Sequence, residues 1–309
     1  MAPLGALLTL LDDRFRVFVH LDAKTELPEA SLRLPPHASL VLPRLPVFWG
    51  GWSMMQATLA LIAAAQSEGN FDQLVLVSGD SLPVLPADEL HARLLDSPQD
   101  FIELLPVAND STLADLDRAS GIARHGWVQP WRFHNFVHLD HRLLNPFQRA
   151  EAAAHYRLPQ DQTDWLRGDV EALTNELLRR QPPRSRLFRT FWYGAQWWAL
   201  RGETLAAILP SLHDPAVQHF FRNMEVPDEH MVQTVLANLR PNAVPEASGT
   251  PMFTDHARRA TGQATLDASG FQTARARGYL FARKFDPAAA ADVAAAIAAG
   301  RYAADVLGG

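Results

Sequence analysis

The stretch SMMQATLALIAAAQSEGNFDQLVLVSGD, from Ser53 to Asp80, decides the fold class. Its first part predicts a helix over Ser53–Gln66, with Ser53 as the N-cap and small apolar residues around much of the helix surface. Its last part, Gln73–Asp80, is a near-continuous apolar run that stops at Gly79 and Asp80, which is typical of a strand inside a sheet. A helix followed by such a strand indicates an α/β domain.

The flanking segments extend this alternation. Strands are predicted at Arg16–Asp22, Ser39–Pro43 and Asp100–Val107, and a helix at Pro86–Asp96. This order predicts a mostly parallel sheet flanked by helices, and such sheets bind ligands beyond the carboxyl ends of their strands. The polar residues near those ends are therefore candidates for a binding site: His20, Asp22, Ser78, Asp80 and Glu103.

The second half of the chain is less regular. Thr190–Leu200 is rich in strand-forming aromatic residues, and two helical segments follow it. The polar region Pro241–Pro251 is the best linker candidate. Gly278–Asp286 is predicted to be a strand or a loop, and an Ala-rich helix closes the chain.

Composition excludes several classes of protein. Of the 309 residues, 48% are hydrophobic, which is enough for a sizeable core. The formal net charge of −6 argues against a surface built throughout for nucleic acid or anionic membrane. The chain has no cysteine, which excludes disulfides and thiolate metal sites. No apolar run approaches the length of a membrane span, so we expect a soluble cytoplasmic protein, with peripheral contact with the inner membrane face left open.

The stretch EVPDEHMVQTVL, Glu225–Leu236, carries the first chemical candidate. Pro227 suits a first helical turn, and Asp228 and Glu229 suit the positive end of the helix dipole. Glu229 precedes the apolar stripe by one turn and should lean toward the buried side. It is therefore a candidate general base, and simple stabilisation of the helix end is the alternative interpretation.

Six segments, taken in order, resemble one family. They are similar to successive blocks of the core-2/I-branching N-acetylglucosaminyltransferases and their relatives, the peptide xylosyltransferases. This chain is shorter than the disulfide-bonded Golgi enzymes and has no cysteine, so it is similar to the bacterial members. The segments are VFVHLDAK (17–24), WGGWSMMQATLALI (49–62), LVLVSGDSLPV (74–84), GAQWWALRGETL (194–205), VPDEHMVQTVL (226–236) and LFARKFD (280–286).

The resemblance implies a GT-A-type α/β fold that binds a nucleotide-sugar and inverts the anomeric carbon. The family's general base matches Glu229, and Asp228 would cap or support the helix end. The family uses basic side chains in place of a metal, and its lysine matches Lys284. Its arginine matches Arg258, with Arg259 as a close competitor. We therefore expect no metal ion and no other cofactor.

The resemblance also implies the partners and the layout of the site. The donor would be a UDP-sugar, UDP-N-acetylglucosamine first and UDP-xylose second, and the acceptor a bacterial glycan or a glycolipid head group. Residues 1–309 would form one glycosyltransferase domain, with 1–123 binding the nucleotide-sugar and 124–309 carrying acceptor and catalytic residues. We expect His20, Asp22 and Asp80 on the donor side. We expect substrate contacts from Glu103, Trp192, Gln196, Trp197 and Asp228.

One departure from the family pattern lies at the N-terminus. Family members open with an apolar strand ahead of the first helix, whereas this chain begins with MAPLGALLTLLDD, which already predicts that helix. We expect the first strand to be missing from the chain. Either the start codon has been placed too far downstream, or the protein works with a trimmed sheet. In the second case the protein could be a catalytically silent, carbohydrate-binding relative.

Two other groups of residues could suggest metal sites, but a simpler explanation is favoured for each. The Asp-x-Asp of Asp115 and Asp117 could hold a metal ion, but its context predicts a solvated helix surface. His134, His138 and His141 suggest a metallohydrolase but lack the glutamate of a His-Glu-x-x-His motif, so surface or packing roles are favoured. Of the tryptophans, most are expected in the core, with Trp192 and Trp197 the best placed as platforms for sugar rings.

Overall fold

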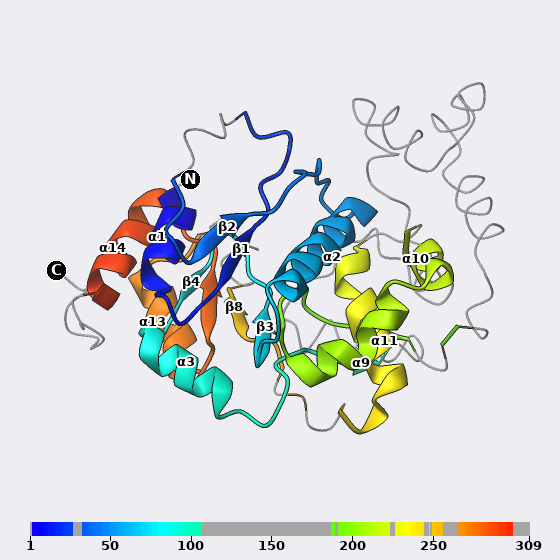
Figure 1. The fold of residues 1–309 in the computed structure, drawn as a ribbon. Helices are drawn as coiled ribbons and strands as arrows, with labels where there is room; N and C mark the ends of the chain where they lie inside the picture. The colour runs from blue at the N-terminus through cyan, green and yellow to red at the C-terminus, as the bar shows by residue number, and fades with distance from the viewer. Residues whose placement is uncertain are drawn as a thin grey trace, which may run out of the picture.

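The computed structural model describes residues 2–26, 33–106, 187–188, 191–222, 226–243, 247, 249–255 and 265–298 of the chain. These residues form the mixed α/β structure that the sequence predicts (Figure 1). The first part contains α1 (Ala2–Leu10), β1 (Val17–Val19), β2 (Ala38–Leu40), α2 (Trp52–Ser67), β3 (Gln73–Val75), β4 (Leu82–Pro83), α3 (Ala87–Leu95) and β5 (Leu105–Pro106).

Several strands of the later part pair with strands of the first part. It contains β6 (Trp192–Tyr193), β7 (Ala199–Arg201), α9 (Gly202–Leu212), α10 (Pro215–Arg222), the 3-10 helix η5 (Pro227–Glu229), α11 (Met231–Leu239), the 3-10 helix η6 (Pro241–Ala243), β8 (Met252–Thr254), α13 (Ala268–Ala276), β9 (Phe281–Arg283) and α14 (Pro287–Ala298). In Figure 1, α1, α3, α13 and α14 lie on one side of the strands, and α2, α9, α10 and α11 lie on the other.

Within the described ranges, the strands do not form the single, mostly parallel sheet that we expected. Among the described residues they form four small sheets, in the orders β1-β2, β3-β7, β4-β9-β8 and β5-β6. Of the strand pairs in the part of the chain that the structure describes, β1-β2 and β8-β9 are parallel and the other three are antiparallel. The reason is that β3, which we expected beside other strands of the first part, pairs instead with β7 from the later part.

The start of α2 also differs from the prediction. Gly51 is the N-cap, and Ser53 lies inside the first turn with only 5% of its surface exposed. The Ser53 hydroxyl accepts a hydrogen bond of 2.8 Å from the Phe48 backbone N–H. It therefore binds the turn before the helix rather than the N–H groups of the helix itself.

Apolar side chains gather in two buried clusters. The first contains Trp52, Met55 and Ile62 of α2 together with residues of α9, α10 and α11. The second contains residues of α1, α3, α13, β9 and α14. Strand β7 belongs to both, because Leu200 lies in the first cluster and its neighbour Ala199 lies in the second. The alternation of side chains along a strand explains this division.

Candidate functional site

The end of β1 carries a cluster around His20 and Asp22. His20 Nε2 accepts a hydrogen bond of 3.0 Å from the Leu45 N–H. Asp22 Oδ1 accepts 3.2 Å from the Val47 N–H, and its Oδ2 pairs with Lys24 Nζ at 2.7 Å. Both side chains therefore hold residues 45–47 against the end of β1.

These contacts determine how the two groups titrate. Burial lowers the pKa of His20, with the charge of Arg44 adding to this effect and that of Asp22 opposing it. Burial acts to raise the pKa of Asp22, but the hydrogen bonds and charge of Lys24, together with the Val47 N–H, outweigh it and lower the pKa. An unprotonated His20 is what its role as acceptor for Leu45 requires.

A second cluster lies where the segment after β3 meets β9. The Asp80 carboxylate receives two hydrogen bonds of 3.3 Å from Arg283, one from Nε and one from Nη2. Lys284 Nζ lies 3.9 Å from Asp80 Oδ2, and Ser78 Oγ donates to Asp80 Oδ1. The Arg283 guanidinium lies over the Trp197 ring, 4.6 Å from its centroid. The structure therefore brings Asp80, Lys284 and Trp197 together, as three of the predicted site residues.

The cations set the charge of Asp80. Burial acts to raise its pKa, but the charge of Arg283, the Ser78 hydroxyl and the charge of Lys284 together hold it below the ordinary value. Asp80 is thus a carboxylate whose negative charge is compensated by two basic side chains at the end of a strand.

A third cluster joins Glu103, the segment 192–197 and the start of α11. The Gly194 N–H donates a hydrogen bond of 3.0 Å to the Glu229 carbonyl, and the Ala195 N–H donates one of 2.8 Å to Glu103 Oε2. Gln233 Nε2 donates 2.9 Å to the Ala195 carbonyl. Gly194 allows this close approach, because a Cβ at that position would overlap the Glu103 carbonyl oxygen.

The Pro-Asp-Glu turn differs from the helix start that we expected. Pro227–Glu229 is the short 3-10 helix η5, and α11 begins only at Met231. No side-chain hydrogen bond from the N-cap residue closes either element. Val226, immediately before the turn, has φ 47°, a left-handed conformation that is unfavourable for a β-branched residue. Such local strain is often found at functional sites.

Asp228 and Glu229 have different environments. Asp228 is only 4% exposed, and no hydrogen bond to its Oδ1 is present among the described residues, whereas Glu229 is half-buried. Burial, and after it the charge of Glu229, raise the pKa of Asp228 to about 8. Asp228 is therefore a buried acid beside the candidate base, rather than an exposed cap.

Short links connect the three clusters. The segment 194–197 bonds to the Glu229 backbone at one end and packs against Arg283 at the other. The Val226 N–H donates 2.8 Å to the Gly50 carbonyl, which places η5 beside the segment that follows residues 45–47. The predicted donor-side and substrate-side residues thus border one region, formed by parts of the chain that are far apart in sequence.

The remaining candidates divide into three groups. Trp192, Gln196 and Trp197 are half-buried, and the Trp192 backbone N–H and carbonyl both bond to the Thr234 hydroxyl at 3.1 Å. Trp52 and Trp198 are core residues. The other candidates lie outside the described residues: Arg258, Arg259, Asp115, Asp117, His134, His138 and His141.

Three residues of the site were not predicted. Arg283 is the chain neighbour of Lys284, but its contact with Asp80 could not be recognised from the sequence. Gly194 and Gln233 lie within the blocks that resemble the family, yet their roles depend on the approach of α11 to the segment 192–197. A glycine within a strand-forming aromatic run was the available signal for a close backbone approach.

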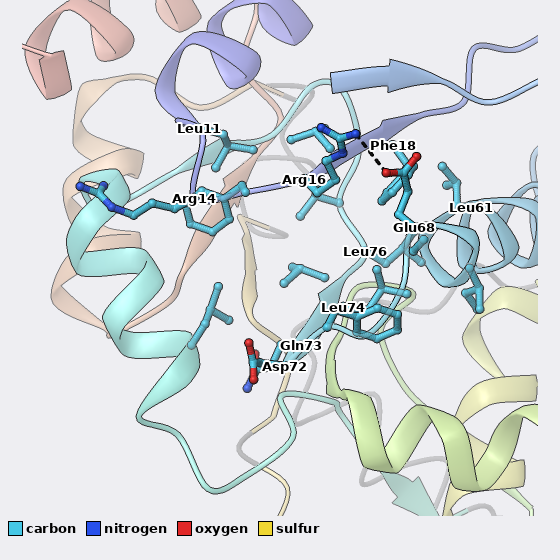
Figure 2. Close-up of a pocket in the computed structure, with 18 of the residues that line it drawn as sticks. Leu11, Arg14, Arg16, Phe18, Leu61, Glu68, Asp72, Gln73, Leu74 and Leu76 are labelled. Atoms are coloured by element: carbon cyan, nitrogen blue, oxygen red, sulfur yellow. Dashed lines mark hydrogen bonds and ion pairs between the residues drawn. The ribbon is translucent and has the colours of Figure 1, made fainter. Parts of the chain in front are cut away.

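The described part of the chain contains two cavities of note, and only the second is lined by a residue of these clusters, Glu103. One, of about 490 Å³, separates β1 from β3 and is lined by residues that include Phe18, Leu61 and Leu74 (Figure 2). At its rim Arg16 pairs with Glu68 at 3.0 Å (Figure 2). The other, of about 570 Å³, is lined by residues that include Glu103, Thr250 and Arg277. Glu229 and Lys284 line neither of these two cavities.

Two further searches covered the described residues. Within this part of the chain, no group of three or more His, Asp or Glu side chains is arranged to hold a metal ion. None of its helices has both the length and the apolar character needed to cross a membrane.

Comparison with known proteins gives a family match over the first third of the chain. No curated protein matches the sequence significantly. A family model does match, over residues 7–110, and it describes the Core-2/I-Branching enzyme. The match covers the blocks that contain His20, Asp22 and Asp80, and it indicates a glycosyltransferase. Over residues 7–110 the chain therefore resembles the Core-2/I-Branching enzyme family, the family that its sequence blocks had indicated.

Proposed function

We propose that this protein is an inverting glycosyltransferase of the GT-A type that moves a sugar from a UDP-sugar to a glycan hydroxyl without a metal ion. UDP-N-acetylglucosamine is the first choice of donor and UDP-xylose the second. The observation that supports this proposal best is the segment 194–197, which bonds to Glu229 and packs against Arg283. It places the candidate base Glu229 and Arg283, the chain neighbour of Lys284, on two ends of one short segment.

In the proposed reaction Glu229 acts on the acceptor. An acceptor hydroxyl is a poor nucleophile until a carboxylate takes its proton. Glu229 would remove that proton while the hydroxyl oxygen forms a bond to the anomeric carbon of the donor. The buried acid Asp228 beside it supports this role, because its raised pKa keeps a second negative charge from competing at neutral pH.

The leaving group is the other half of the reaction. As the bond between the anomeric carbon and the UDP oxygen breaks, negative charge develops on the diphosphate. Lys284, and Arg258 or Arg259, would stabilise this charge in place of a divalent ion. His20 and Asp22 would shape the donor side through residues 45–47. Glu103, Trp192, Gln196 and Trp197 would contact the sugars.

A panel of UDP-sugars, assayed for UDP release with and without EDTA, tests the proposal. We expect release from one donor to be faster than from the others, and to be nearly unchanged by EDTA. The Glu229→Gln variant should retain UDP binding but lose roughly a hundred- to ten-thousand-fold in rate, the usual contribution of a general base. The variant Arg16→Gln, at an exposed ion pair with Glu68, serves as the control and should turn over normally.

Three outcomes would contradict the proposal. Loss of activity in EDTA, restored by a divalent ion, would show a metal-dependent enzyme and return attention to Asp115 and Asp117. Normal turnover by Glu229→Gln would remove Glu229 as the base. Tight UDP binding without UDP release from any donor would favour a catalytically silent, carbohydrate-binding protein.

A further inference from the structure

Asp80 holds three consecutive residues of the chain. Its carboxylate accepts the two hydrogen bonds of 3.3 Å from Arg283 and lies 3.9 Å from Lys284 Nζ. Its carbonyl accepts 3.1 Å from the Phe285 N–H. The distance to Arg283 is close to a hydrogen bond, whereas the distance to Lys284 is beyond one. Asp80 therefore binds Arg283 in preference to Lys284.

Arg283 and Lys284 differ in exposure as well. The Arg283 side chain is 16% exposed and is enclosed between Asp80 and the Trp197 ring. The Lys284 side chain is 44% exposed. A planar guanidinium suits this enclosed position, because it can stack on an aromatic ring and bind a carboxylate at two atoms at once. The exposed ammonium of Lys284 is the cation that an anionic ligand can approach.

We infer that Arg283 and Asp80 form a positioning pair that limits how strongly Asp80 binds Lys284, and so keeps the Lys284 charge effective toward a diphosphate. This inference rests on the proposed contact between Lys284 and the donor. Arg283 satisfies both carboxylate oxygens and repels Lys284. Together the three side chains present a single net positive charge. Without Arg283, Asp80 would neutralise Lys284, and the cluster would offer no net charge to phosphate.

Four proteins test the inference by calorimetric titration with UDP at low ionic strength: wild type, Arg283→Gln, Asp80→Asn and the double variant. Arg283→Gln should bind UDP about tenfold more weakly, as expected when one charge-assisted hydrogen bond weakens. Asp80→Asn should bind at least as tightly as wild type, since it removes a negative charge. The double variant should return to within about threefold of wild type, because no carboxylate is left to neutralise Lys284.

The double variant distinguishes a positioning pair from a direct contact. If it binds as weakly as Arg283→Gln, Arg283 touches the ligand itself and the inference is wrong. If Asp80→Asn alone binds as weakly as Arg283→Gln, Asp80 supports the local structure instead. Arg16→Gln removes the same charge at an ion pair outside the site and should bind UDP like wild type. Equal binding by Arg283→Gln and wild type would also overturn the inference.

A ligand-free measurement separates this inference from the proposed function. In a crystal structure of the Arg283→Gln variant, Lys284 Nζ should move from 3.9 Å to about 2.8 Å from the Asp80 carboxylate. If wild type does not bind UDP, the proposed function fails, but this distance still shows whether Arg283 controls the contact between Lys284 and Asp80. An unchanged distance in the folded variant would show that Arg283 does not control Lys284.

Discussion

Asp228 and Glu229 are adjacent in the chain, but the fold treats their carboxyl groups differently. Asp228 is 4% exposed and Glu229 is half-buried. A buried carboxyl group is costly to ionise, and no hydrogen bond to Asp228 Oδ1 is present among the described residues, so the proton stays on Asp228 until the pH approaches its raised pKa of about 8. The sequence drew attention to this acidic pair, and the family resemblance implied that Asp228 caps or supports the helix end; neither η5 nor α11 has a side-chain hydrogen bond from its N-cap residue.

The raised pKa of Asp228 predicts a pH dependence of stability. Between pH 4 and pH 8 the folded state holds a proton that the unfolded state releases, so the free energy of unfolding falls as the pH rises. Asp228→Asn removes this dependence and has nearly the same shape as the neutral acid. Its stability should match wild type only below about pH 4 and exceed it increasingly above that, with the gap growing by on the order of 4 kcal/mol between pH 5 and pH 9.

Urea unfolding of both proteins at pH 5, 7 and 9 measures this difference. A carboxylate that stabilises a helix end would give the opposite slope, because its pKa would be lowered and its contribution lost in acid. A constant difference between the two proteins would show that Asp228 titrates normally.

At the scale of elements, the segment between β6 and β7 organises the site. It passes so close to the Glu103 backbone that residue 194 has no room for a side chain, and it uses its own backbone to bind Glu103, Glu229 and Gln233. Gly194→Ala would force the added methyl group against the Glu103 carbonyl. We expect a loss of stability of about 1–3 kcal/mol, the usual cost of overpacking, together with weaker UDP binding.

Thermal unfolding and UDP titration of Gly194→Ala measure these two effects. Gly5→Ala is the matched control, because no atom lies within 4 Å of a Cβ at that position in α1. It should leave stability unchanged or raise it by about 0.5–1 kcal/mol. Similar behaviour of the two variants would mean that the segment can shift without affecting the site.

The sequence predicted elements better than their pairing. Apolar periodicity located α2, α3 and α11 to within a few residues, and aromatic residues located β6 and β7. Pairing was different, because β3 meets a strand more than a hundred residues away in an antiparallel register, Leu74 opposite Leu200. The composition of a strand reports burial, not the identity of its neighbour.

At the scale of the whole molecule, the site joins residues from both core clusters. Asp80 and Arg283 come from segments beside the second cluster, while Glu229 precedes α11, which packs in the first. The family resemblance assigned Glu229 and Lys284 individually from local blocks. The contact between Arg283 and Asp80 spans 203 residues, and no local pattern could have predicted it.

Strand β7 contributes buried residues to both clusters, so it should couple their unfolding. Leu200 is fully buried in the first cluster, directly beside Ala199 in the second. Leu200→Ala should therefore lower the free energy of unfolding by about 2–5 kcal/mol, the cost of the lost contacts and of the cavity left behind. Leu42→Ala, at a side chain that is 60% exposed, should change it by no more than about 0.5 kcal/mol.

Coupling is measured by following the unfolding of Leu200→Ala with two probes, tryptophan fluorescence and far-ultraviolet circular dichroism. Coincident transitions are expected, because the residues on the two faces of one strand must lose their packing together. Loss of UDP binding should follow the same curve, because Asp80 lies beside the second apolar cluster and Glu229 precedes α11, which packs in the first. Two separate transitions, with UDP binding lost in only one of them, would show that β7 does not join the cores and that the site depends on one core alone.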